Sequence, residues 1–352
     1  MQKTVKQSDS LTIRVSCLVF FVCLFALLPT GCLSSVEESF QMEKAIEPGT
    51  ELKARTSNGR IKVNVGGAGK ILVRGTKKAR ALTTSKSLLD DINIEVEKKD
   101  GFINVEVHHP KNSFTKQYGA SFDIEVPKNT PVRLVTNNGS IHVSGVIGSV
   151  WVESKNGSLK ILDVTGDVEA RTKNGKVVIS GEMKNILAET SNGKITVATS
   201  GAPTHVSHGS AKKAAVNKKL DPDSALKNPD TEETRVASGS KVILSTKNGS
   251  VKLKGKLSSF RVGSNNGSIT ISADKGSSLK DDSKATTRNG SIKLFLPADF
   301  SCDLSARTNS GRIKSDFPIK EISRKRLSGK LGQGGVRLAL KTRNGSIHIN
   351  KH

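Results

Sequence analysis

Aliphatic and polar residues alternate along most of the chain, and the alternation is organised around a motif that occurs ten times. Each copy has an aliphatic residue five positions before a glycine, a hydroxyl residue three before it and an aliphatic residue two after it. Nine of the ten glycines follow asparagine, and the tenth follows Ser310. Alternation with a period of two predicts a short β-strand on each side of the glycine. The glycines are Gly59, Gly139, Gly157, Gly175, Gly193, Gly249, Gly267, Gly290, Gly311 and Gly345.

The Asn-Gly step is compatible with two folds. As a two-residue hairpin turn, with asparagine and glycine supplying positive φ angles, it would give an antiparallel β-meander or sandwich. As the corner of a coil, it would give a β-solenoid (β-helix), in which equivalent residues stack in parallel about 4.8 Å apart. The glycines from Gly139 to Gly193 recur every 18 residues, so we predict an all-β solenoid of about 18-residue coils. Apolar residues seven positions past a glycine, such as Val146 and Val164, indicate a third short face.

The pattern divides the chain into five segments. Residues 1–31 have a basic start and an apolar run, which is typical of an export signal. We expect a tether at 32–48, an N-terminal β-repeat region at 49–199 and a C-terminal β-repeat region at 241–352. Residues 200–240 lack alternation and are rich in Gly, Ser, Ala, Lys, Asp and Pro, which predicts a disordered insertion between coils. The basic and glycine-rich stretch before Val336 is interpreted as a flexible basic loop.

The leader ends in Leu28-Pro29-Thr30-Gly31-Cys32. This stretch resembles the lipobox of bacterial lipoprotein signal peptides, with Pro29 where that motif usually has leucine. The resemblance implies that Cys32 carries lipid and anchors the protein to a membrane of the cell envelope. Leu33, rather than aspartate, follows the cysteine, which implies the outer membrane if the source is Gram-negative.

The composition and the net charge limit the kinds of ligand that the protein is expected to bind. Aromatic residues make up only 4% of the chain, which suits stacked aliphatic ladders better than a globular core. The net charge is +24, and removal of residues 1–31 takes away three cations and one aspartate and leaves +22. Such a charge attracts anions, so anionic lipid head groups and anionic polysaccharides are candidate partners. No aromatic-rich basic groove is visible, so we expect no specific nucleic-acid binding.

Eight cations flank the Asn-Gly corners, and stacking of the coils would align them along one edge. Several weak contacts between this edge and a polyanion would add up, so the eight form the candidate binding site. The alternative is that they only keep the edge soluble. They are Lys155, Lys173, Lys176, Lys194, Lys247, Arg288, Arg312 and Arg343.

No arrangement of residues predicts catalysis, a cofactor or a metal site. Cys302 lies in an alternating apolar stretch, so we interpret it as a buried strand residue. Glu153 and Glu189 occupy equivalent outward positions with Arg171 between them, which indicates a solvated charge stripe. The alternative is a polysaccharide lyase or hydrolase that uses carboxylates on a β-helix scaffold. The histidines form no cluster with cysteine or carboxylate.

Proline-bearing edges precede the alternating strands at Val126-Pro127-Lys128-Asn129-Thr130 and Leu296-Pro297-Ala298-Asp299, and the motif Thr-x-Asn-Gly-Ser-Ile follows. This combination resembles the bacterial DUF4097 family of putative adhesin domains, over about residues 45–350 apart from the insertion. The resemblance implies a β-helical stack with an adhesin-like surface. We therefore predict a lipid-anchored cell-envelope protein with a binding or scaffolding role that is not an enzyme.

Overall fold

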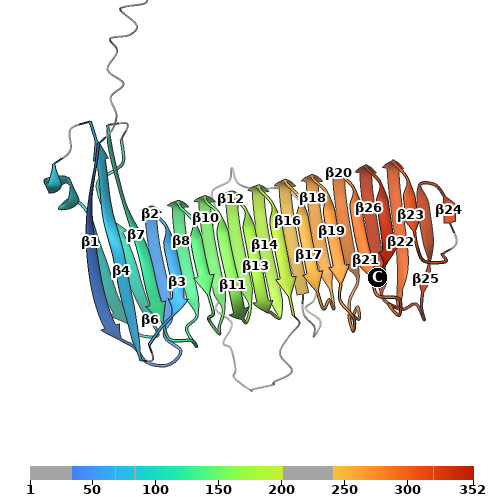
Figure 1. Ribbon diagram of the computed structural model, residues 1–352, viewed down its shortest axis with the longest axis horizontal. Helices are drawn as coiled ribbons and strands as arrows, with labels where there is room; N and C mark the ends of the chain where they lie inside the picture. Colours follow the sequence, from blue (N-terminus) through green and yellow to red (C-terminus); the bar gives the residue numbers. More distant parts are fainter. Residues whose placement is uncertain (1–33, 68, 83–84, 114, 201–240, 320) are drawn as a thin grey trace, which may run out of the picture.

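A computed structural model gives the fold and describes residues 34–352 apart from 68, 83–84, 114, 201–240 and 320. The leader with Cys32, and the predicted insertion from residue 201 on, lie outside the described residues. Two long β-sheets run side by side along the length of the molecule (Figure 1). No helix in the described part of the chain is long and apolar enough to cross a bilayer.

Sheet 1 has 13 strands. In spatial order they are β1 (Ser34–Ala45), β4 (Lys70–Ala81), β7 (Lys116–Val126), β3 (Ile61–Val65), β9 (Ile141–Ser144), β11 (Leu159–Thr165), β13 (Val177–Glu182), β15 (Ile195–Thr199), β17 (Val251–Gly255), β19 (Ile269–Ala273), β21 (Ile292–Leu296), β27 (Ile347–Lys351) and β23 (Ile313–Ser315).

Sheet 2 has 14 strands. In spatial order they are β24 (Glu321–Ser323), β25 (Arg326–Leu331), β22 (Cys302–Ser310), β26 (Arg337–Asn344), β20 (Ser283–Asn289), β18 (Phe260–Asn266), β16 (Lys241–Asn248), β14 (Asn185–Asn192), β12 (Val168–Asn174), β10 (Val150–Asn156), β8 (Val132–Asn138), β2 (Glu51–Asn58), β6 (Phe102–His108) and β5 (Asn93–Lys99). A short 3-10 helix, η1 (Lys86–Leu89), lies between β4 and β5.

Each coil places one strand in each sheet, and equivalent strands of successive coils pair in parallel in the same register, apart from an irregularity in β11 between Ile161 and Val164. Ser154 pairs with Thr172 in sheet 2, and Leu159 pairs with Val177 in sheet 1. The prediction of a β-solenoid is therefore confirmed, and the meander is excluded. We call the ten two-residue connections that begin with the repeat glycine, together with the residues beside them, the corner edge, and the connections from sheet 1 back to sheet 2 the return edge.

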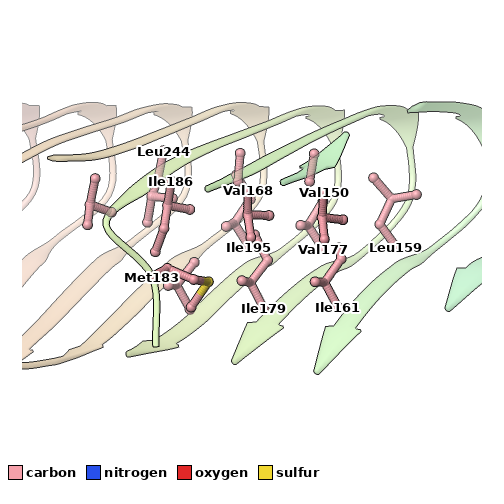
Figure 2. Packing of buried hydrophobic residues seen from close by; sticks show 14 of the residues in the cluster. Val150, Leu159, Ile161, Val168, Val177, Ile179, Met183, Ile186, Ile195 and Leu244 are labelled. Carbon is pink, nitrogen blue, oxygen red and sulfur yellow. The ribbon is translucent and has the colours of Figure 1, made fainter. Parts of the chain in front are cut away.

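The core is a double ladder of aliphatic side chains between the sheets. Figure 2 shows ladders of inward residues that meet in one interior, with Val150, Val168 and Ile186 from sheet 2 and Leu159, Val177 and Ile195 from sheet 1. All of these side chains are at most 2% exposed, so the inward-facing residues of the repeat are shielded from solvent. Val146 and Val164 are also fully buried. They close the return side of this core, because the described strands form two sheets and no third.

Antiparallel strands close both ends of the stack. β1 pairs with β4 and β4 with β7 at one end, and β25 pairs with β22 at the other. The predicted tether is wrong from Ser34 to Ala45, which form β1. Glutamates of β1 face lysines of β4, with 3.2 Å between Lys70 Nζ and Glu43 Oε1. This pairing depends on a distant strand, so the local pattern did not reveal it.

The predicted basic loop before Val336 is also wrong over part of its length. Residues Glu321–Ser323 and Arg326–Leu331 form β24 and β25, and β25 pairs with β24 on one side and with β22 on the other. Leu327 and Leu331 are buried in this cap. The two leucines are four residues apart on one face of β25, and two apolar residues are too short a pattern to predict a strand.

At both ends a coil lies out of chain order. The coil of β26 and β27, the last in the sequence, lies between the coil of β20 and β21 and the coil of β22 and β23. The first coil, β2 and β3, likewise lies inside β6 and β7. The terminal coils are therefore internal members of the stack.

Candidate binding edge at the Asn-Gly corners

The hydroxyl residue of the repeat bonds one coil to the next. Thr172 Oγ1 donates to the carbonyl oxygen of Gly157, at 3.0 Å. Thr or Ser makes the same bond to a corner glycine in nine of the ten coils, and Thr56 donates instead to Ala120 O at 2.9 Å. The hydroxyls are buried beside the core, where an unpaired carbonyl would be costly. This bond explains why a hydroxyl occupies that position in every copy.

The corner glycines are required by close stacking rather than by left-handed backbone. A Cβ on Gly157 would lie 1.8 Å from the carbonyl oxygen of Gly139, and one on Gly267 would lie 1.8 Å from Gly249 O. Of the ten corner glycines only Gly311 and Gly345 have positive φ, at 156° and 159°, which is nearly extended. The positive φ angles that a hairpin turn would require are therefore absent from the corner asparagines and from eight of the ten glycines, and the glycine leaves room for the neighbouring coil's backbone.

The corner asparagines form a continuous hydrogen-bonded ladder. Asn174 Nδ2 donates to Asn156 Oδ1 at 2.7 Å, and Asn192 Nδ2 donates to Asn174 Oδ1 at 2.7 Å. The same side-chain bond joins all nine corner asparagines, at 2.7–2.8 Å. Such a ladder fixes the corner edge as a straight polar line.

The structure brings six of the eight predicted cations together as neighbouring pairs. Lys155 lies beside Lys173, Lys176 beside Lys194, and Arg288 beside Arg343. Lys247 instead lies between Ser191 and Asn265, and Arg312 lies beside Ser346. All eight side chains are exposed at the corner edge. The predicted ladder is thus a set of paired and single charges separated by serine and asparagine.

The edge also contains a cation that the prediction missed. Arg60 follows its corner glycine directly, as Lys176 does, and is exposed. Its position in the repeat was the signal that could have identified it. With Arg60, the two rows that flank the asparagine ladder hold nine cations, no carboxylate and no apolar side chain. None of the nine forms an ion pair with a described residue.

The repeat and the stack agree with a known family. The family model of Toastrack DUF4097 matches residues 43–350. The chain belongs to this family. No curated protein matches the chain.

Several solved structures are similar to this Toastrack chain over most of their length. A putative adhesin from Bacteroides fragilis has 12% identity and a TM-score of 0.38, with 88% of this chain and 96% of that chain covered. A putative adhesin from Parabacteroides distasonis has 11% identity and a TM-score of 0.39, with 89% and 97% covered. A putative cell adhesion protein from Clostridium sporogenes has 11% identity and a TM-score of 0.21, with 90% and 100% covered.

On the outer face of sheet 2, from β8 to β14, charges of both signs contact one another. Arg171 Nε lies 3.1 Å from Glu189 Oε2, and its guanidinium also contacts Glu169. Trp151 Nε1 donates to Glu169 Oε1 at 2.6 Å, and the Arg133 guanidinium lies 4.7 Å from the centre of the Trp151 ring. The carboxylates considered for polysaccharide cleavage thus belong to a charge stripe, in which Arg171 separates Glu189 from Glu153.

A shallow hollow of about 360 Å³ opens on the outer face of sheet 1, directly beside the corner edge. Arg60, Lys62, His142 and Lys160 line it, together with Asp123, whose carboxylate lies 3.5 Å from the Lys62 ammonium. Partial burial, and then the positive charges of Lys160, Lys62 and Arg60, lower the pKa of His142 below its ordinary value of 6.5. The hollow therefore extends the positive potential of the corner edge onto sheet 1.

The remaining chemical groups have structural surroundings. Cys302 is fully buried on β22, as predicted, and burial raises the pKa of its thiol to about 12. A thiol in this state is a poor nucleophile. No group of three or more His, Cys, Asp or Glu among the described residues could hold a metal ion.

Proposed function

We propose that this protein is a non-enzymatic, membrane-anchored protein of the cell envelope, with an adhesin-like binding or scaffolding surface at its corner edge. Its ligand is a polyanion, either an anionic polysaccharide or a layer of lipid head groups. The observation that carries the proposal is the pair of rows beside the asparagine ladder, which hold nine cations and no carboxylate.

The arrangement of the cations supports binding of an extended anion. Neighbouring coils lie about 4.8 Å apart, so the paired cations repel each other and a bound anion relieves that repulsion. Each exposed cation contributes about 1 kcal/mol near an anionic surface. Several such contacts on one rigid edge act together, which gives useful affinity from individually weak contacts.

The anchor in this proposal is lipid on Cys32, for which the support is the lipobox-like Leu28-Pro29-Thr30-Gly31-Cys32. A single acyl chain binds membranes weakly, whereas several chains hold a protein stably. The localisation that follows is the cell envelope, and the outer membrane if the source is Gram-negative.

Binding is tested with a corner variant in which Lys155, Lys173, Lys247 and Arg343 are replaced by alanine. We expect the affinity for a soluble uronate polysaccharide to fall by at least about tenfold, because four contacts of about 1 kcal/mol each are lost. The matched control replaces four exposed lysines of the return edge, Lys184, Lys256, Lys275 and Lys280. Equal affinity of the corner variant and the unchanged protein would remove the proposal, and equal losses in both variants would reduce it to non-specific charge attraction.

Anchoring is tested with Cys32→Ala, followed by fractionation of cells and mass measurement of the protein. We expect the protein to leave the membrane fraction. Its retention there with the leader removed would contradict lipidation at Cys32.

The non-enzymatic part of the proposal is tested by incubating the purified protein with acidic polysaccharides and measuring chain length. We expect no shortening. Depolymerisation that disappears in Glu153→Gln would overturn this part and favour the lyase or hydrolase alternative.

A further inference from the structure

The first described residue of the chain lies at the corner edge. Ser34 pairs with Ala81, and Ala81 pairs with Lys116 of β7. The corner level in β7 is marked by Tyr118, whose carbonyl oxygen accepts from Asn58 Nδ2 at 3.0 Å. Lys116 precedes Tyr118 by two residues, so β1 begins about 7 Å beyond the corner level.

The direction of β1 brings the N-terminal segment in from that side. β1 is antiparallel to β4 and runs from the corner edge towards the return edge, and in Figure 1 it starts on the side where the sheet 2 strands end. Cys32 is two residues before Ser34, and chain geometry keeps it within about 7 Å of Ser34. A membrane anchor at Cys32 therefore holds the folded body by its corner edge, with no tether between them.

The charges of the two edges differ, and the difference favours contact of the corner edge, rather than the return edge, with the membrane. The charged residues in the rows beside the asparagine ladder are all cations, whereas the return edge carries charges of both signs. The carboxylates in or next to the return connections are Asp167, Glu182, Asp274, Asp281, Asp282 and Asp299, and the lysines there are Lys128, Lys184, Lys256, Lys275 and Lys280. An anionic bilayer would therefore attract the corner edge much more strongly than the return edge, where the charges of the described residues largely cancel.

We infer that the corner edge lies lengthwise on the same anionic bilayer that holds the N-terminus, so that the partner of the edge is the lipid head-group layer. This inference rests on the proposed function and chooses lipid among its polyanions. Ten coils about 4.8 Å apart give a line of roughly 45 Å. The cations are spread from Arg60 near the N-terminal cap to Arg312 near the C-terminal cap, so the contact extends along the whole stack.

The chemistry of the edge fits head groups rather than the bilayer interior. Its rows contain Lys, Arg, Ser and Asn and no apolar residue, so nothing is present to insert between acyl chains. The corner asparagines bond to one another along the ladder, which leaves the cations as the groups that meet the phosphates. The contact is therefore electrostatic and sensitive to salt.

The test compares two dye positions on opposite edges of neighbouring turns in the anchored, full-length mature protein. Ser268→Cys places a thiol on the corner edge and Ser278→Cys places one in the return connection; both serines are exposed. The buried Cys302 does not label near neutral pH. The protein is reconstituted in vesicles of phosphatidylethanolamine and phosphatidylglycerol with an acceptor dye on the head groups, and energy transfer is measured.

We expect strong transfer from position 268, weak transfer from position 278, and loss of the difference at high salt or in phosphatidylcholine vesicles. Ser158→Cys, also exposed on the corner edge, should repeat the result and guards against a local folding defect at 268. Equal transfer from both edges, or stronger transfer from 278, would overturn the inference. If transfer is equal but the corner variant still loses polysaccharide binding, the proposed function stands and polysaccharide, rather than lipid, is the partner.

Discussion

The two long edges of the stack are built under different constraints. Every corner connection is two residues long, from Gly59-Arg60 to Gly345-Ser346. The return connections range from the two residues 166–167 to the 41 residues 200–240. At the corner, the glycine, the hydroxyl and the asparagine each contact the next coil, so an added residue would break several bonds at once. At the return edge the connections differ in length from coil to coil, so the chain accepts insertions there.

The difference separates the part of the repeat that specifies the fold from the part that is free to vary. Residues 200–240 leave the stack undisturbed, because Ile186 before them pairs directly with Val242 after them. The corner shows the opposite behaviour, since its hydrogen bonds recur in coil after coil within a few tenths of an ångström. Three substitutions with neighbouring controls measure how much of the stability depends on the corner, and one titration measures the potential beside it.

The largest expected effect is at a corner glycine. Gly267→Ala would place a Cβ 1.8 Å from the backbone oxygen of Gly249, so the coils must separate locally. We expect a loss of about 3 kcal/mol in unfolding free energy. The control is Gly263→Ala on the outer face of β18, the strand that leads to Gly267, where a Cβ meets nothing within 4 Å and should be neutral or stabilising. Denaturant unfolding of both variants is the measurement, and equal losses would show that coil spacing does not require the glycine.

A smaller effect is expected at the hydroxyl position. Thr287→Val keeps the shape but removes the bond from Thr287 Oγ1 to Gly267 O, which is 2.9 Å long. We expect a loss of about 1–2 kcal/mol, because the buried carbonyl loses its side-chain donor. Thr286→Val is the control, since Thr286 Oγ1 is buried without a partner among the described residues and its removal should not destabilise. If Thr286→Val costs as much as Thr287→Val, the hydroxyl bond does not account for the repeat.

The asparagine ladder should contribute less, because it is exposed to water. Asn266→Asp replaces the donor that bonds Asn248 Oδ1 at 2.8 Å and sets two oxygens against each other. We expect a loss of about 1 kcal/mol. Asn265→Asp adds the same charge one residue away, outside the ladder, and should change stability by less than about 0.5 kcal/mol. The difference between the two unfolding midpoints reports the ladder alone.

The smallest effect is the titration of His142, which reports the positive potential beside the corner edge. Its pKa in the folded protein lies below the ordinary value of 6.5, because of burial first and then of Lys160, Lys62 and Arg60. The folded state thus favours neutral imidazole, and its small contribution to stability is lost as the pH falls below the ordinary pKa. An NMR titration should give a midpoint below 6.5 that rises in Lys160→Ala. A midpoint unchanged by that substitution would mean that Lys160 does not contribute to the lowered pKa.

The fixed period was sufficient to predict the solenoid and the inward residues, since a constant length with identical types at each position requires stacking in register. The period also located the cations, because any residue next to a corner glycine must lie on the corner edge. It could not reveal that β1 pairs with β4, since the matching charges are more than 20 residues apart. The period also could not predict the order of the terminal coils. Every coil has the same pattern, so the pattern does not indicate which coils are neighbours.

The place of the last coil has a consequence for how the chain is completed. β26 and β27 separate two coils that were synthesised before them, so a chain cut short near residue 336 would lose an internal rung while keeping the cap that belongs beyond it. Such a chain would have a gap that its own cap cannot close in register, with unpaired strand edges on both sides. β26 and β27 are therefore required to join the C-terminal cap to the rest of the stack.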